Sequence, residues 1–181
     1  MSAKNIQFLR MTYLRGPNIW TYRSVIEALI DIGELEDFPS NLLPGFNDRL
    51  KAWLPQMIEH YCTPGVRGGF FQRLDTGTWA GHILEHVSLE LQTRAGMSMG
   101  FGKAREAGPR GVYKVVIRTD HETVGRTSLE MARELILAAI EVRSVKPFTQ
   151  EENASTTRRV DHEPLAWCTW RGFVAAKVQT F

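Results

Sequence analysis

The stretch WAGHILEHVSLE (79–90) holds the residues best suited to chemistry in this 181-residue sequence. It contains the pattern His-x-x-Glu-His at His82, Glu85 and His86, which is the inverted form of the zinc-peptidase motif. On a helix, histidines four residues apart project from one face, so both imidazoles can reach one zinc ion. Glu85 would lie beside the metal, where a carboxylate can take a proton from water and pass it to a leaving amine. The pattern therefore predicts zinc-dependent hydrolysis.

Two interpretations of these three side chains stay open on the pattern alone. At about 100° per residue, the helix carries one continuous apolar stripe, and His82, Glu85 and His86 fall on the opposite side. The stripe consists of Ala80, Ile83, Leu84, Val87 and Leu91. The histidines are therefore either metal-binding residues or ordinary polar residues that face solvent.

A catalytic zinc site needs a third protein ligand and an open position for water. We expect this ligand to be Glu134, because it adjoins the most apolar section of the last predicted helix (135–140), where a glutamate needs a partner. Two other residues are alternatives: Glu130, one turn before Glu134, and Glu90, in the helix that carries the histidines. Each would be either the third ligand or a residue that hydrogen-bonds to a ligand. An ion pair with Arg133 explains Glu134 equally well without a metal.

Other chemical features of the sequence are weaker. His60 and Cys62 lie beside a glycine-rich loop (62–70). They are either a base and a nucleophile that act as a pair, or Cys62 is simply a small buried residue. The run Gly100–Lys103 resembles a phosphate-binding loop only loosely, because it lacks the Walker spacing. Basic residues in the loops around the helix are solvated surface charges by default, and together they suit an acidic or zwitterionic polymer. Those expected to bind substrate are Arg67, Arg73, Lys103 and Arg105, with Arg110 nearby.

The segments that must position these residues predict an α+β fold, with a small antiparallel or mixed sheet packed with helices. Strands are expected at 6–14, 70–74 and 111–118, with 97–105 as the hairpin partner of the last. Helices are expected from Thr21 to a cap at Gly33, from 47 or 48 past a break at Pro55 to 58, from 79 to 94, and from 122 or 128 to 143.

Composition is that of an ordinary folded protein, with 43% hydrophobic and 23% charged residues. A net charge of +2 argues against binding nucleic acid by bulk electrostatics. No apolar run reaches the roughly 20 residues of a membrane helix, and the N-terminus lacks an export signal. Two cysteines, far apart in the sequence, are too few for a disulfide framework or for a zinc site built from cysteines. We expect a cytoplasmic protein with one domain over residues 1–145 and a linker or tail of uncertain structure over 146–181.

Six stretches carry a family resemblance. They are LRGPNIWTYR (14–23), GELEDFPSN (33–41), GGF (68–70), GTWAGHILEH (77–86), GFGKARE (100–106) and GVYKVV (111–116). Through them, residues from about 5 to 142 resemble the N-terminal domain of cyanophycin synthetase. Cyanophycin is a bacterial nitrogen-storage polymer with an aspartate backbone and arginine on each β-carboxyl group.

The resemblance implies a domain that holds this polymer. In members with an intact His-x-x-Glu-His site, it also implies a zinc-dependent endo-hydrolase that cuts the polymer into primers, with Glu85 catalytic and His82 and His86 as metal ligands. The expected partners are cyanophycin and either a second copy of this chain or a separate synthetase chain, without nucleic acid or membrane. The ATP-grasp and Mur-ligase-like domains of a full synthetase are not expected here. The alternative function is a non-catalytic polymer-anchoring module or a truncated remnant of a synthetase.

Overall fold

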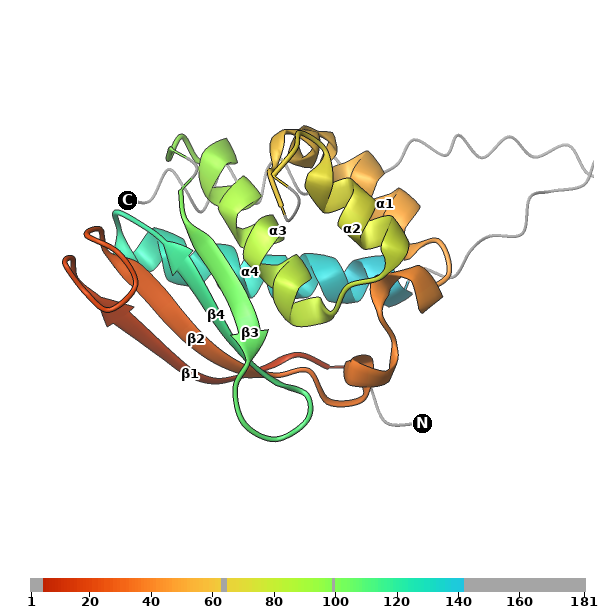
Figure 1. The fold of residues 1–181 in the computed structure, drawn as a ribbon, viewed down its shortest axis with the longest axis horizontal. Helices are drawn as coiled ribbons and strands as arrows, with labels where there is room; N and C mark the ends of the chain where they lie inside the picture. The colour runs from red at the N-terminus through yellow and green to blue at the C-terminus, as the bar shows by residue number, and fades with distance from the viewer. Residues whose placement is uncertain (1–4, 63–64, 99, 142–181) are drawn as a thin grey trace, which may run out of the picture. The chain divides into compact units, whose positions relative to one another are not determined.

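A computed structural model describes residues 5–62, 65–98 and 100–141, which belong to one compact unit, Met1–Ser144. Its described strands form one antiparallel sheet in the order β1-β2-β4-β3, with helices packed against it (Figure 1). This arrangement confirms the predicted α+β class. The strands are β1 (Gln7–Leu14), β2 (Val25–Asp31), β3 (Gly102–Glu106) and β4 (Val112–Arg118). The α-helices are α1 (Phe46–Trp53), α2 (Gly69–Thr76), α3 (Ala80–Arg94) and α4 (Glu122–Glu141), and the 3-10 helices are η1 (Gly33–Asp37), η2 (Ser40–Leu42) and η3 (Pro55–Glu59).

Strand β2 occupies the segment for which the apolar spacing predicts a helix, so that prediction is wrong. The strand lies in the middle of the sheet, antiparallel to both β1 and β4, and Val25, Ile26, Ala28 and Ile30 are fully buried. A strand covered on both faces is apolar almost throughout and loses the alternation that identifies strands. Periodicity alone cannot distinguish such a run from a buried helix.

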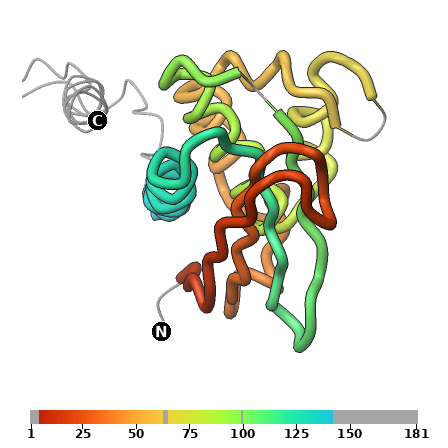
Figure 2. The backbone as a smooth tube through the Cα atoms, turned by 90° about the vertical axis from the view of Figure 1, so that its left-hand side faces the viewer, coloured from red at the N-terminus to blue at the C-terminus, as the bar shows by residue number. Residues whose placement is uncertain are grey.

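The core lies between one face of the sheet and the helices α3 and α4. Paired side chains of β2 and β4 form that face: Ile26 with Ile117, Ala28 with Val115, and Ile30 with Tyr113. Two glycines let the helices approach it closely. A Cβ at Gly125 of α4 would lie 2.7 Å from Cδ1 of Ile26, and one at Gly81 of α3 would lie 2.8 Å from the ring of Tyr113. Both helices therefore cover the same face, and Figure 2 views α4 nearly along its axis beside the strands.

The segment between β2 and α3 consists of short helices. Pro55 follows the end of α1 and begins η3, which confirms the break expected at this proline. Residues 70–74, predicted as a strand, lie instead in α2, so that prediction is wrong. Gly68 precedes this helix with a φ of +77°, and Phe70 and Leu74, one turn apart, are both fully buried. A segment of five residues is too short for the spacing of its apolar residues to distinguish a helix from a strand.

The remaining predicted elements agree with the structure: β1, the hairpin of β3 and β4, and the long helices α3 and α4. The part of the chain that the structure describes contains no helix that could span a membrane. The predicted tail, residues 146–181, lies outside the described residues.

Candidate metal centre

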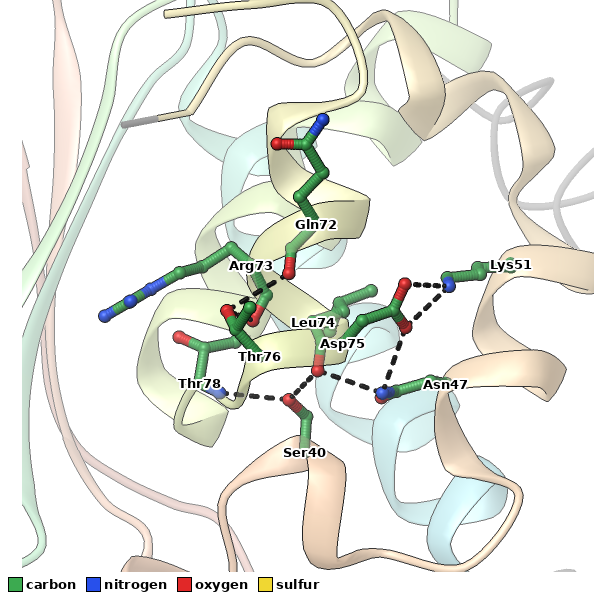
Figure 3. Close-up of polar contacts among 9 residues, drawn as sticks. All are labelled: Ser40, Asn47, Lys51, Gln72, Arg73, Leu74, Asp75, Thr76 and Thr78. Carbon is green, nitrogen blue, oxygen red and sulfur yellow. Dashed lines mark hydrogen bonds and ion pairs between the residues drawn. The ribbon is translucent and has the colours of Figure 1, made fainter. Parts of the chain in front are cut away.

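The turn that leads into α3 is held by a buried hydrogen-bond network (Figure 3). The Ser40 hydroxyl donates to the carbonyl oxygen of Leu74 at 2.7 Å and accepts from the Thr78 N–H at 3.0 Å. The side-chain amide of Asn47 donates to the same carbonyl oxygen at 2.9 Å. The start of α3 is therefore tied to η2, α1 and the end of α2.

Thr78 in turn orients His82, in the first turn of α3. The Thr78 hydroxyl lies 2.8 Å from Nδ1 of His82, so the opposite ring nitrogen, Nε2, points away from Thr78. That Nε2 lies 3.1 Å from Nε2 of His86. The two histidines of the sequence motif thus converge through the same ring nitrogen, as their four-residue spacing on a helix predicts.

Cys62, which follows η3, joins the two histidines. Its Sγ lies 3.3 Å from Nε2 of His82, and the ligand atoms of all three side chains lie within 4.8 Å of one another. In a tetrahedral zinc site with ligands at about 2.0–2.3 Å, neighbouring ligand atoms are about 3.3–3.7 Å apart. The three side chains therefore lie close enough together to hold one metal ion. In the described ranges, no other His, Cys, Asp or Glu side chains converge in this way.

Burial keeps both histidines of this cluster neutral. Loss of solvation, helped by the charge of Arg73, lowers the pKa of His82 to about 4. Loss of solvation also lowers the pKa of His86, and repulsion from His82 and His60 adds to the effect. Because the neutral imidazole is the form that binds metal, neither histidine must release a proton to do so at neutral pH.

Glu85 lies beside the cluster, at a cavity of about 440 Å³ that Cys62, His82 and His86 also line. The residue is 7% exposed, and burial raises the pKa of its carboxyl group to about 8. None of the described residues donates a hydrogen bond to this carboxyl group. A carboxyl group held in a cavity with a raised pKa is typical of acid–base residues in active sites.

Strand β3 and the residues before it form another part of the cavity wall, from Gly100 to Ala104. A Cβ at Gly102 would lie 2.5 Å from Oε1 of Glu85 and 2.8 Å from Cδ1 of Leu89. The absence of a side chain at this position therefore leaves room for the Glu85 carboxyl group. The run that loosely resembles a phosphate loop serves here as a wall against α3.

The expected third ligand, Glu134, does not join the two histidines. Its side chain is 64% exposed and lies 3.9 Å from Arg133, so the expectation that it is buried is wrong. The buried face of α4 carries its neighbours Leu135 and Ile136, and Glu134 lies on the solvent side, as does the alternative Glu130. The ion pair with Arg133 is the interpretation that the structure supports.

Cys62, and not Glu134, lies beside the two histidines, and the sequence analysis did not identify it as a candidate ligand. Twenty residues separate it from His82 along the chain. The one available signal was its position beside His60 at a glycine-rich loop. The other alternative ligand, Glu90, is buried and contacts His60 and Arg94 instead.

The four basic residues predicted to bind substrate are spread over the surface. Lys103 lines the cavity, and Arg73 lies close enough to lower the pKa of His82. Arg67 forms an ion pair with the exposed end of η3, and the guanidinium of Arg105 lies 5.0 Å from the centre of an aromatic ring in the loop after β1. Of these four residues, only Lys103 therefore lines the cavity, and Arg73 acts on the centre through its charge.

The sequence of the chain was compared with known protein families. The family described as the cyanophycin synthase-like N-terminal domain matches residues 27–141. The chain belongs to this family. The resemblance inferred from the six sequence stretches is thereby confirmed.

Individual relatives agree with this membership. Cyanophycin synthetases from Crocosphaera subtropica, Geminocystis herdmanii and Synechocystis sp. are 47%, 44% and 46% identical to the chain over 123 residues. The matched region is 67% of this chain but 14% of each relative. The chain therefore corresponds to one domain of these longer proteins.

Proposed function

We propose that this domain binds cyanophycin and hydrolyses amide bonds of its polyaspartate backbone at a zinc centre, cutting the polymer into primers. One observation carries the proposal: Cys62, His82 and His86 converge at a cavity whose wall also holds Glu85. Family membership supports cyanophycin as the substrate, because the relatives are cyanophycin synthetases.

The donor set suits zinc, since a thiolate and two imidazoles are among its preferred ligands. Cys62, His82 and His86 would hold the ion and leave its cavity side open. When bound, zinc would polarise the scissile carbonyl group and lower the pKa of water at the site. Beside this positive charge, Glu85 would be ionised at neutral pH even though burial alone raises its pKa.

The remaining chemistry belongs to Glu85 and the cavity wall. Glu85 would take a proton from the attacking water and deliver it to the leaving nitrogen, so one carboxyl group acts as base and then as acid. Lys103 lines the same cavity and would attract a carboxyl group of the polymer. Arg73, near His82, would contribute a second positive charge on the approach.

Zinc binding is tested by competition with a coloured chelator, using protein that has been stripped of metal. The wild-type chain should bind one equivalent. Cys62→Ser should weaken binding by more than about 100-fold, because it removes a direct ligand rather than a supporting hydrogen bond. Glu134→Gln, on the exposed face of α4, should bind like the wild type. Equal binding by Cys62→Ser would show that another group is the third ligand, and no binding by the wild type would refute the zinc centre.

Catalysis is tested by the loss of turbidity of an insoluble cyanophycin suspension with zinc-loaded protein. Glu85→Gln should keep its zinc and clear the suspension at least about 100-fold more slowly, the usual effect of losing an acid–base residue. His121→Gln, which changes an exposed histidine, should clear it at the wild-type rate. Wild-type protein that sediments with the polymer without clearing it would establish the non-catalytic anchoring module instead. An active Glu85→Gln protein would exclude the role given to Glu85.

A further inference from the structure

Two buried polar residues, His60 and Glu90, have no role in the proposed reaction. Their side chains are 1% and 2% exposed. His60, at the end of η3, lies between two groups of α3: its Nδ1 is 3.1 Å from Nδ1 of His86, and its Nε2 is 3.3 Å from Oε2 of Glu90. Arg94, one turn beyond Glu90, donates from Nε to the other carboxyl oxygen, Oε1, at 2.8 Å. A chain of four groups therefore runs from Arg94 to the metal centre.

Glu90 sets the direction of every hydrogen bond in this chain. Burial raises the pKa of Glu90, but the hydrogen bonds from His60 and Arg94 lower it, and the net result is a pKa below its usual value. An ionised carboxylate only accepts hydrogen bonds, so His60 must donate from Nε2. When the His60 ring carries a single N–H, that hydrogen lies on Nε2, and Nδ1 of His60 is therefore an acceptor.

The proton on His86 follows from this arrangement. Because Nδ1 of His60 accepts, the facing Nδ1 of His86 must carry the hydrogen and donate it. Nε2 of His86 is then free of hydrogen, and this is the atom that lies 3.1 Å from Nε2 of His82 at the centre of the cluster. The hydrogen-bond chain thus selects the tautomer of His86 that can bind a metal through Nε2.

We propose that His60 and Glu90 are positioning residues, which hold His86 in the tautomer and ring orientation that present a bare Nε2 to the metal. Metal-binding histidines commonly donate their second N–H to a carboxylate or a carbonyl oxygen, and here an imidazole is inserted between the ligand and its carboxylate. This inference rests on the metal centre proposed above, but it is independent of the identity of the polymer.

The isosteric variant Glu90→Gln tests the proposal sharply, because Arg94 dictates how the new amide must lie. The amide oxygen would face the donor Nε of Arg94, so the amide NH₂ group would face His60 and donate to its Nε2. His60 would then carry its proton on Nδ1, and His86 would be forced to carry its own on Nε2. We expect zinc affinity to fall by about 10–100-fold. Glu130→Gln, the same change on the exposed face of α4, should leave it unchanged.

A second variant distinguishes this role from a purely structural one. In Glu90→Gln/Arg94→Leu, the side-chain amide of the new glutamine is free to turn its oxygen toward His60. This would restore the original direction of the hydrogen bonds from His86 through His60 to residue 90. Zinc affinity should therefore recover at least about tenfold relative to Glu90→Gln. Thermal stability should fall further, because Arg94 also donates to Gln56 at 2.6 Å. A role limited to filling the core predicts that affinity and stability fall together.

Nitrogen chemical shifts of the histidine rings provide a readout that does not depend on any variant. In metal-free wild-type protein, NMR should show His86 protonated on Nδ1 and His60 on Nε2, and both should reverse in Glu90→Gln. The opposite tautomers in the wild type would overturn the proposal, as would unchanged zinc affinity in Glu90→Gln. Wild-type protein that binds no zinc would refute the metal centre itself, which separates that failure from a failure of the hydrogen-bond chain alone.

Discussion

Burial shifts the pKa values of Glu85 and His82 in opposite directions, and both side chains are therefore neutral in the metal-free protein at neutral pH. It raises the pKa of the carboxyl group to about 8 and lowers that of the imidazole to about 4. Neither of these two side chains is therefore charged at neutral pH before a metal ion binds. Metal binding at this centre should be coupled to ionisation of Glu85, and so should strengthen as the pH rises.

The raised pKa of Glu85 predicts how the stability of the metal-free protein depends on pH. The unfolded chain loses this proton near pH 4.5, whereas the folded protein keeps it to about pH 8. Between these values the native state binds more protons, so raising the pH lowers the free energy of unfolding, by at most about 1.4 kcal/mol per pH unit. Glu85→Gln has no such proton, so its stability should fall less between pH 6 and 8.

Denaturant unfolding of both proteins, with a chelator present, measures this difference. The histidines of the cluster contribute to both proteins and largely cancel in the comparison. Parallel pH profiles for the wild type and Glu85→Gln would show that the carboxyl group is solvated in the folded state.

The first half of helix α3, which carries the histidines, is positioned by three contacts. Thr78 is held at its start by Ser40, Gly81 lies against Tyr113 of β4, and Glu85 lies against Gly102 of β3. Each contact comes from a different element, and two of them require a residue without a side chain. The position of the proposed metal ligands on α3 therefore depends on close packing of helix against sheet.

Gly102→Ala should impair catalysis more than folding. The new Cβ would lie 2.5 Å from Oε1 of Glu85, and a carboxyl group can rotate away at modest cost in stability. A displacement of about 1 Å at the reacting groups can cost about 100-fold in rate, so we expect a loss of clearing activity of that order. Zinc affinity should change little, because the ligands are not displaced.

Gly125→Ala provides the matched control, with a Cβ that would lie 2.7 Å from the fully buried Ile26 of β2. Overpacking at this position should lower the free energy of unfolding by about 1–3 kcal/mol, while the folded fraction keeps its activity. Urea unfolding and turbidity clearing should therefore rank the two variants in opposite orders. The same ranking in both assays would show that Gly102 matters only for folding.

In the whole molecule, the centre is assembled from three segments that are distant in sequence. Cys62 follows η3, the histidines and Glu85 belong to α3, and β3 forms the facing wall of the cavity. All of them lie within the compact unit Met1–Ser144. The family match, residues 27–141, also lies within this unit.

A chain shortened to residues 1–144 should therefore keep the metal centre. We expect its zinc affinity and its melting temperature to be close to those of the full chain, because the proposed ligands, the described core and the family match all lie within this unit. Chelator competition and a thermal melt measure both. A lost centre or a large fall in melting temperature would show that residues 145–181 contribute to the folded domain.

The sequence by itself determined the features that depend on local physics. Hydrogen bonds within a helix join residues four apart, so the spacing of His82 and His86 predicts a shared face whatever surrounds the helix. The break at Pro55 is equally local, because proline lacks the N–H that an α-helix needs. The same local patterns, read together as six stretches, were enough to indicate the family.

Only the tertiary structure decided the features that depend on contacts between distant segments. Val25–Asp31 is a strand because β1 and β4 lie on either side of it, and its apolar run contains no sign of those partners. Glu134 faces solvent because only one side of α4 packs on the core, although its neighbours in sequence are apolar. Cys62 reaches His82 only after the chain has folded back, since separation along the chain does not determine separation in space, and burial then sets the pKa of Glu85.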